Sequence, residues 1–163
     1  MEDLTDGVVT LRPFHEEDIP AIAAACVDPE IARFLPDVPQ PYTIDDAHAY
    51  IAYAATEWAS GRQRPLAIVG RTDEAFVGAI EVRLEKEGSI GYWIAPANRG
   101  RGFATRALVL LSRWAVSEGG VERLKLTTHP ENLASQRVAV RAGFSCEERR
   151  ADAVVFLLCR SDL

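Results

Sequence analysis

Long apolar runs, paired cysteines and an excess of positive charge are all missing from this sequence. No stretch of its 163 residues approaches the roughly 18 consecutive apolar residues that a membrane span needs, and the acidic first six residues hold no apolar signal core. The net charge of −6 is opposite to the basic excess of a general nucleic-acid binder. We therefore expect a cytoplasmic protein that binds neither membranes nor nucleic acids.

Cysteine is scarce and scattered along the chain. Cys26, Cys146 and Cys159 are odd in number and include no Cys-x-x-Cys spacing, so the sequence predicts neither a disulfide framework nor a metal site. The remaining composition is ordinary for a soluble globular protein, with 48% hydrophobic and 26% charged residues. We expect one domain, residues 1–163, that is long enough to bury its own core.

The first third of the chain is predicted to be mainly helical. After a short strand that ends at Pro13, an acidic turn at residues 16–18 opens one helix, and residues 30–34 form a second. Three prolines within residues 35–42 require an extended loop. Thr43 and Asp46 then match a capping box at the start of a longer amphipathic helix, which ends at Gly61.

From Pro65 onward the apolar residues alternate as they do in strands. We predict strands at residues 66–69, 76–84 and 90–95. Turns at residues 71–74 and at Gly88 would join them into an antiparallel meander. A helix to residue 117, a strand at 123–128, a helix at 132–142 and a strand at 153–159 complete the chain. Because strand–helix–strand implies a parallel crossover, the sequence predicts an α+β fold with a mixed, mostly antiparallel sheet flanked by helices.

The most informative segment is a glycine-bearing turn between a strand and a helix. Residues 99–105 read Arg-Gly-Arg-Gly-Phe-Ala-Thr. Gly100 and Gly102 let the backbone approach a ligand closely, and Arg99 and Arg101 add positive charge at the rim. The start of the following helix contributes unpaired N–H groups and the positive end of its dipole. Such a turn can hold a phosphate without a metal, although the same residues also suit an ordinary strand-to-helix turn.

Two other phosphate-binding motifs are excluded by the surrounding residues. A Walker loop ends in Gly-Lys followed by Ser or Thr, which this turn lacks. A Rossmann fingerprint needs a third glycine within an N-terminal strand–helix–strand unit. Here Thr105 occupies that position, and the turn follows antiparallel strands. A dinucleotide site is therefore not expected.

The turn resembles that of the GNAT superfamily of acyl-CoA-dependent N-acetyltransferases. Residues 99–104 match the family's (Gln/Arg)-x-x-Gly-x-(Gly/Ala) motif, and a second family element follows as Asn-Leu-Ala-Ser at 132–135 and Arg-Ala-Gly-Phe at 141–144. The front of the chain is similar to the branch of ribosomal-protein N-terminal acetyltransferases. The segments that carry this likeness are residues 11–13, 34–36, 43–47 and 90–94. The resemblance covers essentially the whole chain.

The resemblance implies acetyl-CoA as cosubstrate and names the residues that hold it. In the family, backbone amides of the turn hold the pyrophosphate, and the strand before the turn splays from its parallel neighbour to pair with the pantetheine arm. A backbone amide near Ile94 would polarise the thioester, and Asn132 would either bond to the arm or simply cap its helix. The implied set is Trp93, Ile94, Ala95, Arg99, Gly100, Arg101, Gly102, Phe103, Ala104, Thr105, Asn132 and Ser135.

The implied reaction is direct attack of a neutral amine on the thioester, which needs a proton acceptor and a group that stabilises the leaving thiolate. Many relatives place a tyrosine where this chain has Ala139, so the resemblance makes Ser135 the expected thiolate stabiliser. Many also carry a glutamate where this chain has Ser89. Glu81 on the neighbouring strand is then the candidate base, with His129 or a chain of waters as alternatives.

These residues predict an enzyme that moves an acetyl group from acetyl-CoA to a primary amine. The acceptor would be a protein N-terminal α-amine or a small-molecule amine, and the protein a monomer or a homodimer. Because Ala139 and Ser89 depart from the commoner family pattern, a non-catalytic acyl-CoA-binding or sensor module stands as the alternative. No motif names the acceptor.

Overall fold

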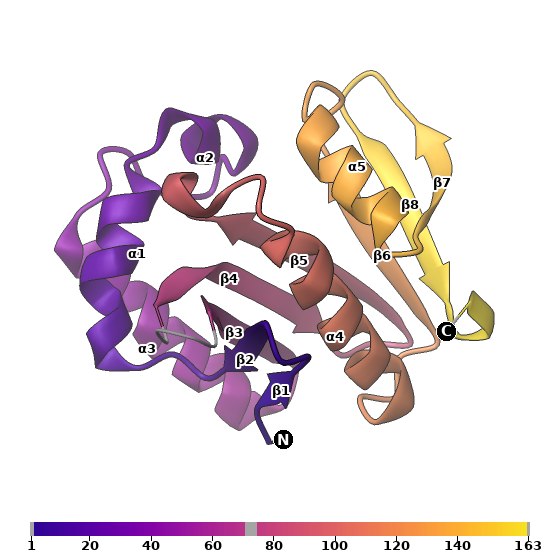
Figure 1. Ribbon diagram of the computed structural model, residues 1–163, viewed down its shortest axis with the longest axis horizontal. Coiled ribbons are helices and arrows are strands. Elements are labelled where there is room, and N and C mark those ends of the chain that lie inside the picture. The colour runs from indigo at the N-terminus through magenta and orange to yellow at the C-terminus, as the bar shows by residue number, and fades with distance from the viewer. Residues whose placement is uncertain (1, 71–74, 163) are drawn as a thin grey trace.

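A single mixed sheet organises the molecule. The computed structural model describes residues 2–70 and 75–162. Within these residues, eight strands follow the order β1-β2-β3-β4-β5-β6-β8-β7 (Figure 1). The strands are β1 (Leu4–Thr5), β2 (Val9–Arg12), β3 (Gln63–Gly70), β4 (Phe76–Arg83), β5 (Glu87–Ile94), β6 (Arg123–Thr128), β7 (Ser145–Arg149) and β8 (Val154–Cys159). Neighbouring strands are antiparallel except β5 and β6, which confirms the predicted α+β fold.

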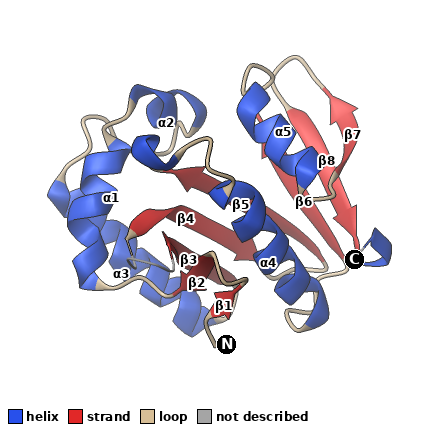
Figure 2. Ribbon diagram, viewed as in Figure 1, coloured by secondary structure: helices blue, strands red, loops and turns tan. Residues whose placement is uncertain are grey.

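Helices cover both faces of this sheet. They are α1 (Ile19–Cys26), α2 (Pro29–Phe34), α3 (Ile44–Ser60), α4 (Phe103–Ser117) and α5 (Leu133–Arg141), with short 3-10 helices at Glu16–Asp18, Pro96–Asn98 and Arg160–Asp162. The pair α1 and α3 packs on one face of the N-terminal half, α4 packs on the other, and α5 lies against β6 and β7 (Figure 2). Across the described residues, no helix has the length and apolar character needed to cross a membrane.

Two apolar clusters attach the helices to the sheet. The larger joins Leu108 of α4 to Ile80 of β4, and the smaller joins Ile22 of α1 to Ala47 of α3. Side chains alternate between the two faces along a strand. Glu81 therefore points away from α4, toward the face that α1 and α3 cover.

The capping box predicted for α3 is present. The Asp46 carboxylate accepts from the Thr43 backbone N–H at 2.8 Å, while the Thr43 hydroxyl accepts from the Asp46 N–H at 3.3 Å. The helix ends at Gly61, whose φ of 73° is a left-handed conformation that glycine adopts without strain. Local sequence signals therefore define this helix at both ends.

Three features of the fold differ from the sequence prediction or lie outside it. Strands β1 and β7 were not predicted, and every residue of β7 is exposed, so no alternation of apolar residues marks it. Gly88 does not form a turn but lies buried within β5. A Cβ at Gly88 would lie 2.6 Å from the Arg83 carbonyl oxygen, so close packing requires the glycine there. The turn predicted at residues 71–74 falls outside the described residues.

The sheet opens between its two parallel strands. β5 and β6 pair only at Glu87–Arg123, Gly88–Leu124 and Ser89–Lys125. Beyond these pairs β5 stays joined to β4 as far as Ile94, and β6 stays joined to β8 as far as Thr128. The two strands therefore diverge toward their carboxyl ends (Figure 1), which leaves one backbone edge of each strand without a strand partner.

Candidate functional site

A cavity of about 510 Å³ lies where β5 and β6 separate. One wall is the end of β5 with the glycine turn, and the facing wall is the end of β6 with the start of α5. A third side is formed by α2. The lining includes Glu30, Arg33, Phe34, Gly91, Tyr92, Trp93, Ile94, Arg99, Gly100, Gly102, Phe103, Ala104, Thr105, Thr128, His129, Asn132, Ser135, Arg137 and Arg141.

The glycine turn presents backbone N–H groups to this cavity. Gly100 and Gly102 have φ values of 74° and 81°, which few residues other than glycine adopt without strain. Among the described residues, the N–H groups of residues 100–105 donate to no backbone carbonyl, and the first such bond into the helix runs from Arg106 to Gly102. These groups and the dipole of α4 make the turn a site for an anion.

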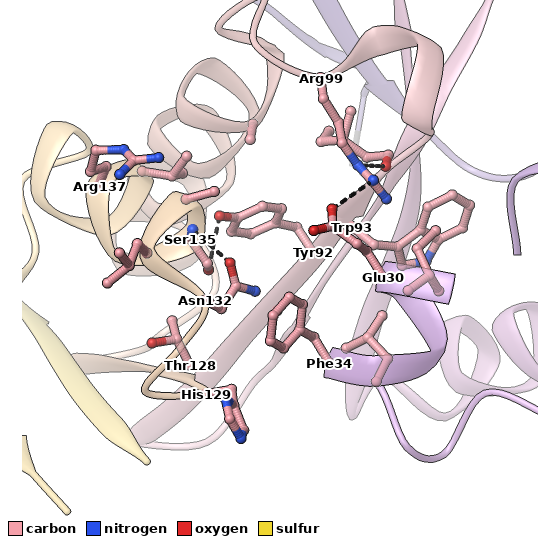
Figure 3. Close-up of a pocket in the computed structure, with 18 of the residues that line it drawn as sticks. Glu30, Phe34, Tyr92, Trp93, Arg99, Thr128, His129, Asn132, Ser135 and Arg137 are labelled. Carbon is pink, nitrogen blue, oxygen red and sulfur yellow. Dashed lines mark hydrogen bonds and ion pairs between the residues drawn. The ribbon is translucent and has the colours of Figure 1, made fainter. Parts of the chain in front are cut away.

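The Arg99 side chain connects the turn to α2. Its guanidinium pairs with the carboxylates of Asp28 and Glu30, the latter at 2.9 Å, and its Nε donates to the Ile94 carbonyl at 3.3 Å (Figure 3). Two carboxylates thus offset its charge within the protein. Arg101 instead stacks over the Phe103 ring, 4.9 Å from its centroid, and is exposed outside the lining.

Helix α2 also reaches the opposite side of the cavity. The Phe34 ring lies 5.6 Å from that of His129, measured between centroids, and Arg33 forms an ion pair with Glu131. Both partners belong to the loop between β6 and α5. Helix α2 therefore contacts both halves of the opened sheet, and His129 lines the cavity beside an aromatic ring (Figure 3).

The start of α5 carries the predicted pair Asn132 and Ser135. The Asn132 side-chain oxygen accepts from the Ser135 N–H at 3.0 Å, so this residue does cap the helix. The Ser135 hydroxyl accepts in turn from the Tyr92 phenol at 3.0 Å (Figure 3). Burial raises the pKa of Tyr92 to about 12, against a smaller lowering by the bond to Ser135. Ala139 is fully buried one turn further on.

Glu81 lies on β4 outside the lining of the cavity. It pairs directly with Gly91 of β5, so the two residues share the face that α1 and α3 cover. A Cβ built on Gly91 would meet no atom within 4 Å, so there is open space beside Glu81. Burial raises the pKa of the Glu81 carboxyl, with Arg83 opposing and Glu57 adding to the shift. The raised pKa makes this carboxylate a better proton acceptor than an exposed glutamate.

Most of the predicted cosubstrate residues come together in this cavity; Ala95 and Arg101 do not line it. Sequence reasoning missed the contribution of α2 and two cations on α5, Arg137 and Arg141. These arginines are four residues apart on a predicted helix, which places them on one face. Neither forms an ion pair with a described residue. The site thus offers unpaired strand edges, an anion-binding turn and cations, which fit acetyl-CoA.

Comparisons with known proteins agree with this geometry. A family model described as an acetyltransferase (GNAT) domain matches residues 9–145. YjcK of Bacillus subtilis (strain 168), a probable N-acetyltransferase, is 26% identical over 111 residues, or 65% of this chain and 61% of YjcK. The chain thus matches less than two thirds of that relative's length.

Two solved structures show the same fold. RimJ of Mycobacterium smegmatis, in complex with CoA-disulfide, has a TM-score of 0.85 at 23% identity over 99% of this chain and 88% of RimJ. RimL, a ribosomal L7/L12 α-N-protein acetyltransferase in complex with coenzyme A, has a TM-score of 0.84 at 20% identity over 97% of this chain and 98% of RimL. The family model spans the diverging strands, the glycine turn and α5. The chain therefore belongs to the GNAT family of acetyltransferases.

Proposed function

We propose that this protein transfers an acetyl group from acetyl-CoA to a primary amine. The observation that carries the proposal is the opening between β5 and β6, which continues into the glycine turn at residues 100–105. The backbone N–H groups of this turn donate to no backbone carbonyl of the described residues. An ordinary strand-to-helix turn would not need the preceding strand to separate from its neighbour. A long ligand with amide groups and a pyrophosphate needs both features, and family membership supports the same ligand.

Each wall of the cavity has a separate part in holding the cosubstrate. The N–H groups of residues 100–105 bind the pyrophosphate, and Arg137 and Arg141 add positive charge nearby. The unpaired edge of β5 at Trp93 and Ile94 bonds to the pantetheine arm, and the amide near Ile94 polarises the thioester carbonyl. Asn132 uses its oxygen as a helix cap, which leaves its amide nitrogen to donate to the arm.

The amine approaches from the other face of β5, through the open space over Gly91. Its nitrogen attacks the thioester carbonyl carbon, a C–N bond forms, and the C–S bond then breaks with the electron pair on sulfur. The proton lost from the nitrogen passes to Glu81, directly or through water, since burial favours the protonated form of this carboxyl. His129 is the alternative acceptor of that proton, because it lines the cavity.

The acceptor class that we favour is a protein N-terminal α-amine, with a small-molecule amine as the alternative. RimL, which has the same fold, acts on a ribosomal protein. The cavity lining also includes the exposed carboxylates of Glu30 and Glu131, which attract an amine-bearing substrate. Both carboxylates pair with arginines, so this attraction is weak.

A second candidate function is a non-catalytic acyl-CoA-binding module. The observation that favours it is the fully buried Ala139, where many relatives carry a tyrosine that protonates the thiolate. A module of this kind would keep the glycine turn and the diverging strands. It would have no need for Glu81 beside an open space.

Release of free CoA thiol decides between the two functions. Acetyl-CoA and succinyl-CoA are each mixed with the protein and a panel of peptide N termini and small amines, while calorimetry measures CoA binding separately. We expect tight CoA binding and amine-dependent thiol release with acetyl-CoA. Binding without release for any acceptor would refute the enzyme and support the module, and absence of binding would refute both.

A further inference from the structure

We infer that Tyr92 is a positioning residue for Ser135, whose hydroxyl it fixes as a hydrogen-bond donor to the leaving thiolate. The inference deepens the proposed function and rests on it. Its basis is the 3.0 Å hydrogen bond from the Tyr92 phenol to the Ser135 hydroxyl oxygen (Figure 3). Both residues line the cavity.

The location of this bond suits a role at the reacting centre. Tyr92 lies on β5 beyond the last residue that pairs with β6, and Ser135 lies in the first turn of α5. The bond therefore spans the opening between the two halves of the sheet. On β5, Tyr92 is followed directly by Trp93 and Ile94, whose backbone lies along the proposed pantetheine path. The two hydroxyls thus face the region that the thioester would occupy.

The direction of the bond determines what Ser135 can do. A serine hydroxyl has one hydrogen and two acceptor positions. Because a phenol is a stronger acid than an aliphatic alcohol, Tyr92 is the favoured donor in this 3.0 Å bond, which leaves the hydrogen of Ser135 available to an acceptor in the cavity. Burial raises the pKa of Tyr92 to about 12, so the phenol keeps its proton at any working pH and remains a donor.

This pair compensates for the absence of a phenol on α5. Ala139 is fully buried and has no polar atom in its side chain, whereas Tyr92 brings a phenol into the cavity from the strand. When the C–S bond breaks, the sulfur keeps the electron pair and accepts a hydrogen bond from Ser135. Ser135 keeps its proton, because a thiol is a far stronger acid than an alcohol. The thiolate later takes its proton from water, which balances the proton that the amine gave up.

The test replaces Tyr92 with phenylalanine, which keeps the ring and removes only the hydroxyl. We expect Tyr92→Phe to lower kcat about tenfold, the ordinary effect of one lost hydrogen bond, with the KM for acetyl-CoA unchanged. The thiol of bound CoA, followed by the ultraviolet absorbance of its thiolate, should titrate about one unit higher than in the wild type. The matched control is Tyr53→Phe, because the exposed Tyr53 phenol bonds to Gln63 away from the cavity.

A double variant separates a positioning role from a merely structural one. Tyr92→Phe combined with Ser135→Ala should be no slower than Ser135→Ala alone, because the phenol acts through that serine. Additive losses would overturn the inference, as would an unshifted thiol pKa in Tyr92→Phe or an equal loss of kcat in Tyr53→Phe. The thiol titration needs only CoA binding, so it decides the role of Tyr92 even if no amine is acetylated. A wild-type protein that does not bind CoA would overturn the inference together with the proposed function.

Discussion

Replacing Gly102 with glutamate is expected to weaken acetyl-CoA binding. Gly102 has a φ of 81°, and a Cβ built on it would meet no atom within 4 Å. Gly102→Glu therefore creates no clash inside the protein and costs only backbone strain, about 1–2 kcal/mol for a residue with a Cβ. The larger effect falls on the ligand, since the new carboxylate extends from the turn whose N–H groups we propose hold the pyrophosphate.

The size of that effect follows from Coulomb's law. Two like charges about 4 Å apart repel by about 1 kcal/mol in water and by about 4 kcal/mol near a protein surface. The affinity for acetyl-CoA should therefore fall between about fivefold and about a thousandfold, and the bulk of the side chain adds to this loss. Gly102→Ala brings the strain without the charge, so its loss of affinity should be much smaller.

Gly120 offers a matched control at the other end of α4. It has a φ of 74°, and a Cβ built on it would likewise meet no atom within 4 Å, but it lies outside the cavity lining. Gly120→Glu should lower the melting temperature as Gly102→Glu does and leave calorimetric binding of acetyl-CoA unchanged. Unchanged affinity in Gly102→Glu, or an equal loss in Gly120→Glu, would show that the turn does not hold the pyrophosphate.

Three further predictions concern the carboxylates and the proposed acceptor side. Burial raises the pKa of Glu81, so the protonated form that the fold favours is lost as pH rises. The melting temperature of Glu81→Gln should therefore exceed that of the wild type at pH 8, and the difference should vanish toward pH 4. Burial opposes ionisation of Asp18, but bonds from Arg12 and the His15 N–H lower its pKa overall. The stability that Asp18 contributes is therefore present above its ordinary pKa and lost on acidification. In urea unfolding at neutral pH, Asp18→Asn should cost about 3 kcal/mol. An unchanged pH midpoint of acid unfolding in this variant would contradict this. Gly91→Val fills the space beside Glu81 and should slow amine turnover on the order of tenfold while calorimetry shows acetyl-CoA affinity retained; equal turnover would place the amine elsewhere.

Local signals were sufficient for much of the fold and for the glycine turn. The capping box of Thr43 and Asp46 and the cap at Asn132 each depend on residues three apart, so the sequence itself displays them. The glycine turn was likewise visible because its conformation depends on its own residues. The splay of β5 from β6, which the family resemblance implied, is present in the strand register.

Features that depend on distant partners were not predictable. Gly88 looked like a turn residue, but it is required by its approach to the Arg83 carbonyl and to Val121, 33 positions later in the 163-residue chain. The hydrogen bond from Tyr92 to Ser135 joins residues 43 positions apart. The ion pairs of Arg99 join it to residues of α2 and its N-cap, about 70 positions earlier in the chain. An arginine expected to bind phosphate therefore also holds α2 against the glycine turn.

Because few residue pairs join β5 and β6, a ligand bound between these strands should increase the stability of the fold. Only three residue pairs join these strands, so the β6–α5–β7–β8 half has few sheet bonds to the rest of the molecule. If CoA lies between the diverging edges, as we propose, it adds bonds between the two halves and raises the free energy of unfolding by about 2.7 kcal/mol at a hundredfold excess over its Kd. Resistance of the protein to a protease should then rise with the concentration of CoA.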